Sequence, residues 1–243
     1  MSRSKGLWLK EIMMMRGFHI FLLVIYGVLS IITLSNEHTI FLSTEYMIGQ
    51  SIMGLMIIPC TMLFSLNMEK HQMTLFLFQK GNIKKQIQMK WLHAFLLYLL
   101  FFIWLSLLSI VSIMLDFSDS TLAALMKIIW YLFFYMLIIQ MIATVAIFIA
   151  WVIYQWIRNK VGFLLSVIVM VITFVVFFEF FQRLFEIPII LNFWTIEIQT
   201  EQMPFQLFIT DGYLSMSMII FTGAILYFFY WLSLQLFIKK VEV

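Results

Sequence analysis

Residues 161–181 read VGFLLSVIVMVITFVVFFEFF, and Glu179 is the single charged side chain in this run. A helix of about 20 mostly apolar residues crosses the hydrocarbon core of a bilayer. Inside lipid the backbone amides must be hydrogen-bonded within the segment, and a helix satisfies them. This stretch therefore predicts a transmembrane helix.

The rest of the chain has the same character. Of its 243 residues, 64% are hydrophobic and 11% are charged, whereas soluble domains average roughly 45–50% apolar and about 25% charged. The mean hydropathy is +1.04. These values exclude a soluble protein with one core. We expect an all-α, polytopic membrane protein with a single transmembrane domain (1–243) and six spans, at about 17–35, 47–66, 92–115, 122–152, 161–181 and 214–237.

The fourth span, 122–152, is too long for one perpendicular crossing. A long apolar segment is accommodated by tilting or by extending beyond the membrane. We therefore expect this helix either to tilt or to continue past the cytoplasmic face through Tyr154 and Gln155.

Basic residues divide unevenly between the two sets of connections. Thirteen of the 15 Lys and Arg residues fall before span one, between spans two and three, between spans four and five, or after span six. The opposite side has Lys127 and Arg183, with most of the acidic residues. Cytoplasmic loops carry the excess of Lys and Arg, so both termini are expected inside. The cytoplasmic set is Arg3, Lys5, Lys10, Arg16, Lys70, Lys80, Lys84, Lys85, Lys90, Arg158, Lys160, Lys239 and Lys240.

Two segments outside the spans are also predicted to be structured. In residues 5–16 the side chains Trp8, Ile12 and Met15 follow helical spacing, which predicts an amphipathic helix lying in the cytoplasmic interface. The extracellular segment 182–213 is rich in apolar and aromatic residues, and we expect part of it to re-enter the membrane or to lie on it.

The sequence offers no pattern for catalysis, a cofactor or a metal. Gly81-Asn82-Ile83-Lys84-Lys85 lacks the first glycine and the hydroxyl residue of a nucleotide-binding P-loop. The four histidines form no i, i+4 pair, and we expect His19 and His93 to meet lipid head groups near the cytoplasmic ends of their spans. The basic residues are scattered over loops, so nucleic acid is not an expected partner. ATP hydrolysis would require another chain.

Glu179 and Arg183 are the charged residues most in need of an explanation, because ionisable groups are costly in a membrane span. Their spacing of four residues suits a local ion pair on one helix face. A role in substrate contact or gating is the other interpretation, and the sequence leaves both open.

The cytoplasmic connection 67–91 carries the most informative pattern. Glu69 opens it, Thr74 precedes the apolar run Leu75-Phe76-Leu77-Phe78, and Gly81-Asn82 interrupts the helix signal before the basic residues that include Lys84 and Lys90. An apolar helix presented to the cytoplasm favours a protein partner.

This pattern resembles the connection between spans two and three of ABC-2 type permeases, the membrane subunits of ATP-driven exporters. That family commonly has a glutamate, a Gly-Thr pair, an apolar run, a Pro-containing turn and a lysine at these offsets. Met73 and Asn82 stand here where the family has its glycine and proline. The six-span layout with an N-terminal interfacial elbow helix is also similar.

The resemblance implies that segment 69–79 is a coupling helix seated in a cytoplasmic ABC ATPase. The coupling residues would be Glu69, Thr74, Leu75, Phe76, Phe78, Gly81 and Lys84. It further implies that ATP and Mg²⁺ are bound by the ATPase, that this chain is no enzyme, that a second permease chain completes a homodimer or heterodimer, and that the protein lies in a bacterial plasma membrane.

The apolar spans favour a hydrophobic or amphipathic substrate, and the family resemblance points to export of, or immunity to, a peptide such as a bacteriocin or toxin. The same composition suits a lipid-like molecule, and helices that merely face lipid also have it. The alternative is a non-transporting membrane immunity or adaptor protein that binds a partner or toxin.

Overall fold

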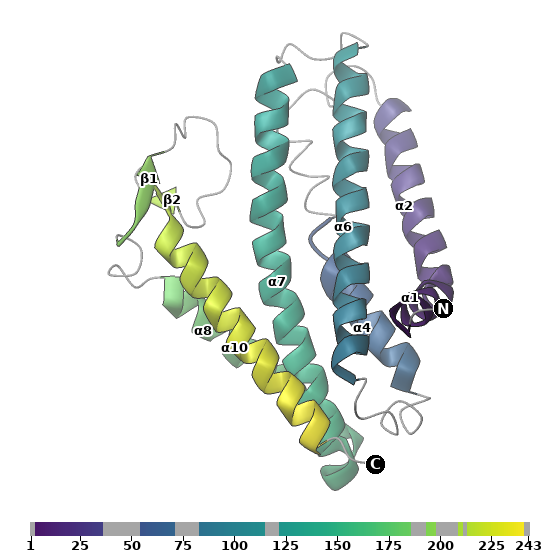
Figure 1. The fold of residues 1–243 in the computed structure, drawn as a ribbon, viewed down its shortest axis with the longest axis vertical. Helices are drawn as coiled ribbons and strands as arrows, with labels where there is room; N and C mark the ends of the chain where they lie inside the picture. The colour runs from purple at the N-terminus through teal and green to yellow at the C-terminus, as the bar shows by residue number, and fades with distance from the viewer. Residues whose placement is uncertain are drawn as a thin grey trace. The chain divides into compact units, whose positions relative to one another are not determined.

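The computed structural model of the chain describes residues 3–35, 54–70, 83–114, 122–185, 193–197, 209–210 and 213–240. These ranges contain seven helices (Figure 1), which are α1 (Arg3–Met14), α2 (Arg16–Ser35), α4 (Ile57–Lys70), α6 (Ile83–Met114), α7 (Leu122–Val161), α8 (Phe163–Phe185) and α10 (Met216–Lys240). The chain forms two compact units, Met1–Gln140 and Met141–Val243, and α7 passes from the first to the second.

Four helices are long and apolar enough to cross a membrane. Their apolar stretches are Ile83–Leu108, Leu132–Arg158, Phe163–Phe185 and Met216–Lys239. A fifth candidate is the pair Lys5–Met14 and Arg16–Val28, whose two helices are bent by 58° at the break. The expected span 47–66 meets a helix, α4, whose apolar part Ile57–Met68 is shorter than a full crossing, and residues 47–53 lie outside the described part of the chain.

Two predicted connections are helical in the residues that the structure describes. Within 67–91, α4 continues to Lys70 and α6 already begins at Ile83. The connection 155–160 is part of α7, which continues through Tyr154 and Gln155 to Val161. Gly162 alone separates α7 from α8, with a left-handed φ of 85°. Because a side chain is strained in that conformation, glycine is the residue suited to this reversal.

The first unit packs around α6. Helices α1 and α4 both contact α6, and Met62 and Leu66 of α4 are buried with Ile87 of α6. Within this unit, two hydrogen bonds connect α6 and α4 to the N-terminal half of α7. The Tyr98 hydroxyl donates to the Phe133 carbonyl over 2.6 Å, and the Ile58 amide donates to Gln140 Oε1 over 2.9 Å.

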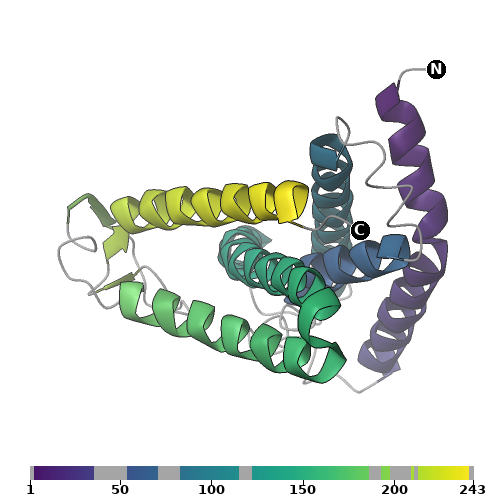
Figure 2. The same ribbon diagram turned by 90° about the horizontal axis from the view of Figure 1, so that it is seen from below.

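The second unit is held together by aromatic contacts. Trp151 of α7 packs on Phe237 of α10 with ring centroids 5.6 Å apart, and Phe177 of α8 packs on Phe229 of α10 at 5.2 Å. Figure 2 shows α8 (green) and α10 (yellow) as the two long helices that end this unit. Each helix leaves many apolar side chains exposed, as expected for segments that face lipid.

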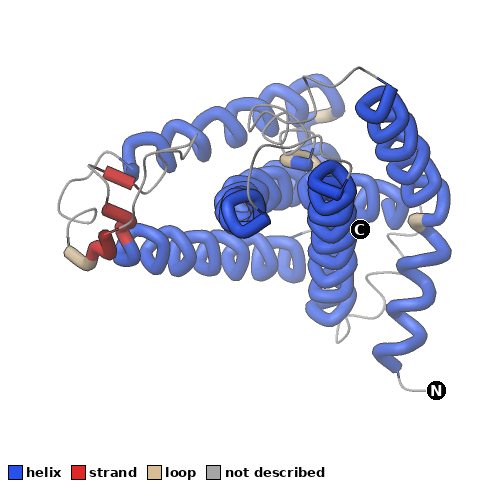
Figure 3. Tube along the Cα trace, turned by 90° about the horizontal axis from the view of Figure 1, so that it is seen from above, coloured by secondary structure: helices blue, strands red, loops and turns tan. Residues whose placement is uncertain are grey.

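The second unit also contains a small antiparallel sheet, which the sequence did not predict beside the helices. Strands β1 (Thr195–Glu197), β2 (Ile209–Thr210) and β3 (Tyr213–Ser215) pair in the order β1-β3-β2. Ile196 pairs with Leu214, and Thr210 pairs with Tyr213. The strands (red in Figure 3) lie where α8 ends and α10 begins. The segment 182–213, which the sequence predicts to be extracellular, is therefore partly β-structure in its described residues.

Candidate functional site

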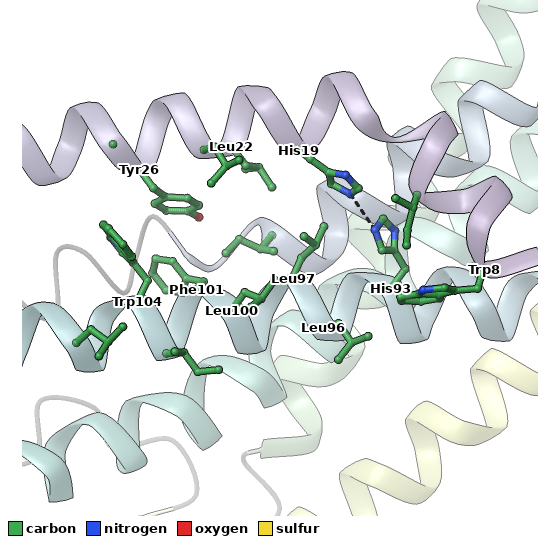
Figure 4. A pocket seen from close by; sticks show the side chains of 16 residues that line it. Trp8, His19, Leu22, Tyr26, His93, Leu96, Leu97, Leu100, Phe101 and Trp104 are labelled. Atoms are coloured by element: carbon green, nitrogen blue, oxygen red, sulfur yellow. Dashed lines mark hydrogen bonds between the residues drawn. The ribbon is translucent and has the colours of Figure 1, made fainter. Parts of the chain in front are cut away.

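A cavity of about 680 Å³ lies in the first unit between α2 and α6, with residues of α1 and α4 also in its wall. Ligand pockets in proteins commonly measure about 300–1,000 Å³. Figure 4 shows Leu22 and Tyr26 of α2 pointing toward Leu97 and Phe101 of α6 across this space. The walls are predominantly leucine, isoleucine and aromatic side chains, so the cavity is apolar over most of its length.

A pair of histidines forms one end of the cavity. His19 Nε2 and His93 Nε2 are 2.9 Å apart and hydrogen-bonded, and the Trp8 ring meets the His93 ring edge-on with centroids 5.6 Å apart (Figure 4). A bond between two imidazoles requires one nitrogen to donate a proton and the other to accept it. His93 is buried at 3% exposure. The expectation that both rings simply meet lipid head groups is therefore wrong for His93.

One turn before His93, a second polar cluster ties three helices together. Lys90 Nζ of α6 lies 3.1 Å from Glu11 Oε2 of α1. The Ser65 hydroxyl of α4 donates to Glu11 Oε1 and accepts from Lys90 Nζ. All three side chains are buried. We call Glu11, Ser65 and Lys90 the polar junction.

The polar junction is stable because each charge has partners. Removing a carboxylate or an ammonium from water costs several kcal/mol per ion, and a close counter-ion with additional hydrogen bonds offsets that cost. Lys90 also donates to the Ser65 carbonyl oxygen over 3.4 Å. The junction therefore fixes α1 against both α4 and α6.

The structure describes two of the predicted coupling residues. Glu69 lies in the last turn of α4, and Lys84 lies, exposed, in the first turn of α6. Residues Thr74, Leu75, Phe76, Phe78 and Gly81 fall within 71–82, outside the described residues.

The predicted pair Glu179 and Arg183 is a local contact. Arg183 Nε donates to Glu179 Oε1 over 3.0 Å within one turn of α8, and the two side chains are 77% and 55% exposed for Arg183 and Glu179. Neither residue lines the cavity between α2 and α6. The geometry agrees with the interpretation as a helix-surface ion pair.

The polar junction and the histidine pair were not recognised in the sequence. Glu11 and Lys90 are 79 positions apart, and His19 and His93 are 74 apart. One signal was present, because Glu11 is the single acidic residue among the first 36 and stands between basic neighbours. In the ranges that the structure describes, no group of three His, Cys, Asp or Glu side chains is arranged to hold a metal ion.

The class that this fold defines is a helical membrane protein, with four helices long and apolar enough to span and a buried polar junction beside an apolar cavity. A comparison of the chain with protein-family models, curated proteins and solved structures finds no match.

Proposed function

We propose that the chain is the membrane-spanning subunit of an ATP-driven exporter of the ABC-2 type. It would expel a hydrophobic or amphipathic substrate such as a bacteriocin or toxin peptide. The chain would perform no covalent chemistry itself. A separate cytoplasmic ABC ATPase would bind ATP and Mg²⁺, and a second permease chain would complete the pathway.

The polar junction is the observation that supports this proposal best. Segment 71–82 is flanked by α4 on one side and by α6 on the other. Ser65 lies near the end of α4 and Lys90 near the start of α6, and both contact Glu11 of α1. A force applied to the segment between these two helices would therefore reach α1 directly.

A movement of the polar junction would also change the cavity. His93 follows Lys90 by one turn of α6 and lies at the cavity end, while Trp8 precedes Glu11 by one turn of α1 and lines the same end. A shift of the junction would change the spacing between α1 and α6 at this point. This is the response that a coupling helix requires from the membrane helices around it.

In this proposal α1 is the interfacial elbow helix, and the 58° bend between Lys5–Met14 and Arg16–Val28 marks where the chain enters the membrane. The proposal requires six spans, an even number that would put both termini on the cytoplasmic side of a bacterial plasma membrane. The basic side chains of Lys84 and Lys85 are exposed in the first turn of α6, as expected for residues at the cytoplasmic surface.

The proposal is tested by affinity purification of the tagged full-length chain from its native membrane. Phe76→Asp and Phe78→Asp should each abolish co-purification of an ABC ATPase detected by mass spectrometry. Phe193→Asp is the matched control, because Phe193 is 88% exposed in the segment before β1 and is predicted to be extracellular. This control should retain the ATPase.

Full retention of the ATPase by both variants would contradict the coupling role. Protection against a toxin that persists after the ATPase has lost its hydrolytic activity would instead support a non-transporting immunity protein.

A further inference from the structure

The cavity between α2 and α6 has the length of a lipid acyl chain. Its lining residues on α6 run from His93 to Leu107, a distance of about 21 Å at the helical rise of 1.5 Å per residue. One leaflet contributes about 15 Å of hydrocarbon, half of a core of about 30 Å. A single acyl chain therefore fits along the cavity, beside the helix rather than across it.

The walls suit an acyl chain better than a peptide. Beyond the histidine end, Tyr26 and Trp104 are the lining residues that carry side-chain polar atoms. A buried peptide backbone would bring several N–H and C=O groups into this space, and each unpaired group would cost free energy. An acyl chain has no such groups, so its burial along these walls leaves no hydrogen bond unmade.

One end of the cavity is polar, and this indicates where the head group of a ligand would lie. Trp8, His19 and His93 gather there, and all three carry ring nitrogens. Tryptophan and histidine rings are common where an apolar site meets a head-group region. The ligand's head is therefore expected at this end and its tail toward Leu107.

The charges around this end favour an anionic head. Lys5 precedes Trp8 by three residues and Arg16 precedes His19 by three, a spacing that places each cation one helical turn from a lining residue. Both cations are exposed. The nearby carboxylate of Glu11 is already paired with Lys90, so it leaves the local charge positive.

We propose that this cavity binds the acyl chain of a single-chain anionic membrane amphiphile, with the head beside Trp8 and His19 and the chain along Leu22, Leu97 and Leu100. The site belongs to the chain alone and requires neither an ATPase nor transport. Failure of this proposal would consequently leave the proposed exporter function standing. Failure of the exporter proposal would likewise leave this ligand site standing.

Two glycines of α2 provide a matched pair of variants. Gly27 lines the cavity, and a Cβ added there meets no atom within 4 Å. Gly17 also meets no atom within 4 Å, but it does not line the cavity. Gly27→Leu should therefore fill the cavity, whereas Gly17→Leu adds the same side chain to the same helix outside it.

The probe is a diazirine-bearing palmitic acid, added to the full chain in phosphatidylcholine nanodiscs, with the labelled residues mapped by mass spectrometry after photolysis. In the parent protein and in Gly17→Leu, labelling should saturate and concentrate on the lining residues of α2 and α6. Gly27→Leu should reduce that labelling by about tenfold, which equals about 1.4 kcal/mol of binding free energy. Leu97→Trp should reduce it similarly and covers the case in which Gly27→Leu fails to fold.

A second comparison tests whether the head group is anionic. The acid should label more strongly than its methyl ester, and Arg16→Gln should weaken labelling by the acid without changing labelling by the ester. Equal labelling of Gly27→Leu and Gly17→Leu, or equal labelling of the cavity and the exposed face of α8, would overturn the site. Equal labelling by acid and ester in the parent would overturn the anionic head.

Discussion

The Glu11 carboxylate and the Lys90 ammonium lie 3.1 Å apart with exposed fractions of 5% and 1%, and they join the first helix of the chain to the start of α6. Breaking a buried ion pair by removing one partner leaves an uncompensated charge, which destabilises a protein by about 3–5 kcal/mol. Loss of either charge would therefore weaken the contact between α1 and α6.

A double-mutant cycle tests this role. Glu11→Leu and Lys90→Met should each lower the free energy of unfolding by about 3–5 kcal/mol, and the double variant should lose less than either single change because no charge is left unpaired. Unfolding is measured by denaturant titration in detergent, followed by circular dichroism. Lys84→Met is the control, since Lys84 is exposed on the same helix. Additive losses in the double variant would contradict the pairing.

The close approach of Gly54 to Phe101 predicts a steric limit at the cavity wall. A Cβ on Gly54 would lie 2.4 Å from Phe101 Cε1, and Phe101, which lines the cavity, also packs on Tyr26 with centroids 5.0 Å apart. Gly54→Ala should therefore displace the ring and cost about 1–3 kcal/mol of stability.

The control for Gly54 is Gly223→Ala in α10, where an added Cβ meets no atom within 4 Å. That change should be neutral or stabilising by up to about 1 kcal/mol, because alanine favours helix. Phe101→Leu combined with Gly54→Ala should recover part of the loss by making room. Equal thermal stability of Gly54→Ala and the parent would show that the Phe101 ring moves aside without cost, which would contradict this prediction.

The reversal between α7 and α8 depends on Gly162. Its φ of 85° lies in the left-handed region, where a non-glycine residue costs roughly 1–2 kcal/mol. Gly162→Ala should lower the unfolding free energy by that amount, and Gly162→Asn by less, because asparagine tolerates this conformation better. Gly17→Ala, inside α2 with open space around the new Cβ, should not destabilise. A loss in Gly17→Ala that matches the loss in Gly162→Ala would argue against a conformational cause.

Because Glu179 and Arg183 form an exposed pair on α8, we expect a change at either residue to alter stability only slightly. We also expect the two charges to be interchangeable. Glu179→Gln or Arg183→Gln should change stability by about 0.3–0.5 kcal/mol, the usual value for an i, i+4 pair on a helix. The reversed variant Glu179→Arg with Arg183→Glu should retain parental stability and parental resistance or export in cells. Loss of function in the reversed variant, with stability unchanged, would assign the pair a role in substrate contact or gating.

Hydropathy anticipated the helices better than the connections. The predicted segments 161–181 and 214–237 match α8 and α10 except for their first two residues, since a run of apolar residues has few alternatives in lipid. Helix ends were less accurate, because the polar residues 83–91 and 155–160 continue helices beyond the apolar run. The small sheet was missed, although Asp211-Gly212 stands between the paired residues Thr210 and Tyr213 and is a dipeptide that favours tight hairpins.

The sequence by itself determined that this chain consists mainly of long apolar helices, because hydropathy is a local property that needs no knowledge of neighbours. The tertiary structure decided which polar residues meet. Glu11 was one charge among the basic residues of the N-terminal segment, and His19 and His93 were separate rings on separate helices. The Glu11–Lys90 contact joins residues 79 positions apart, and the His19–His93 contact joins residues 74 apart. Only the packing of α1, α2 and α4 around α6 brings these side chains together, at or next to one end of the cavity.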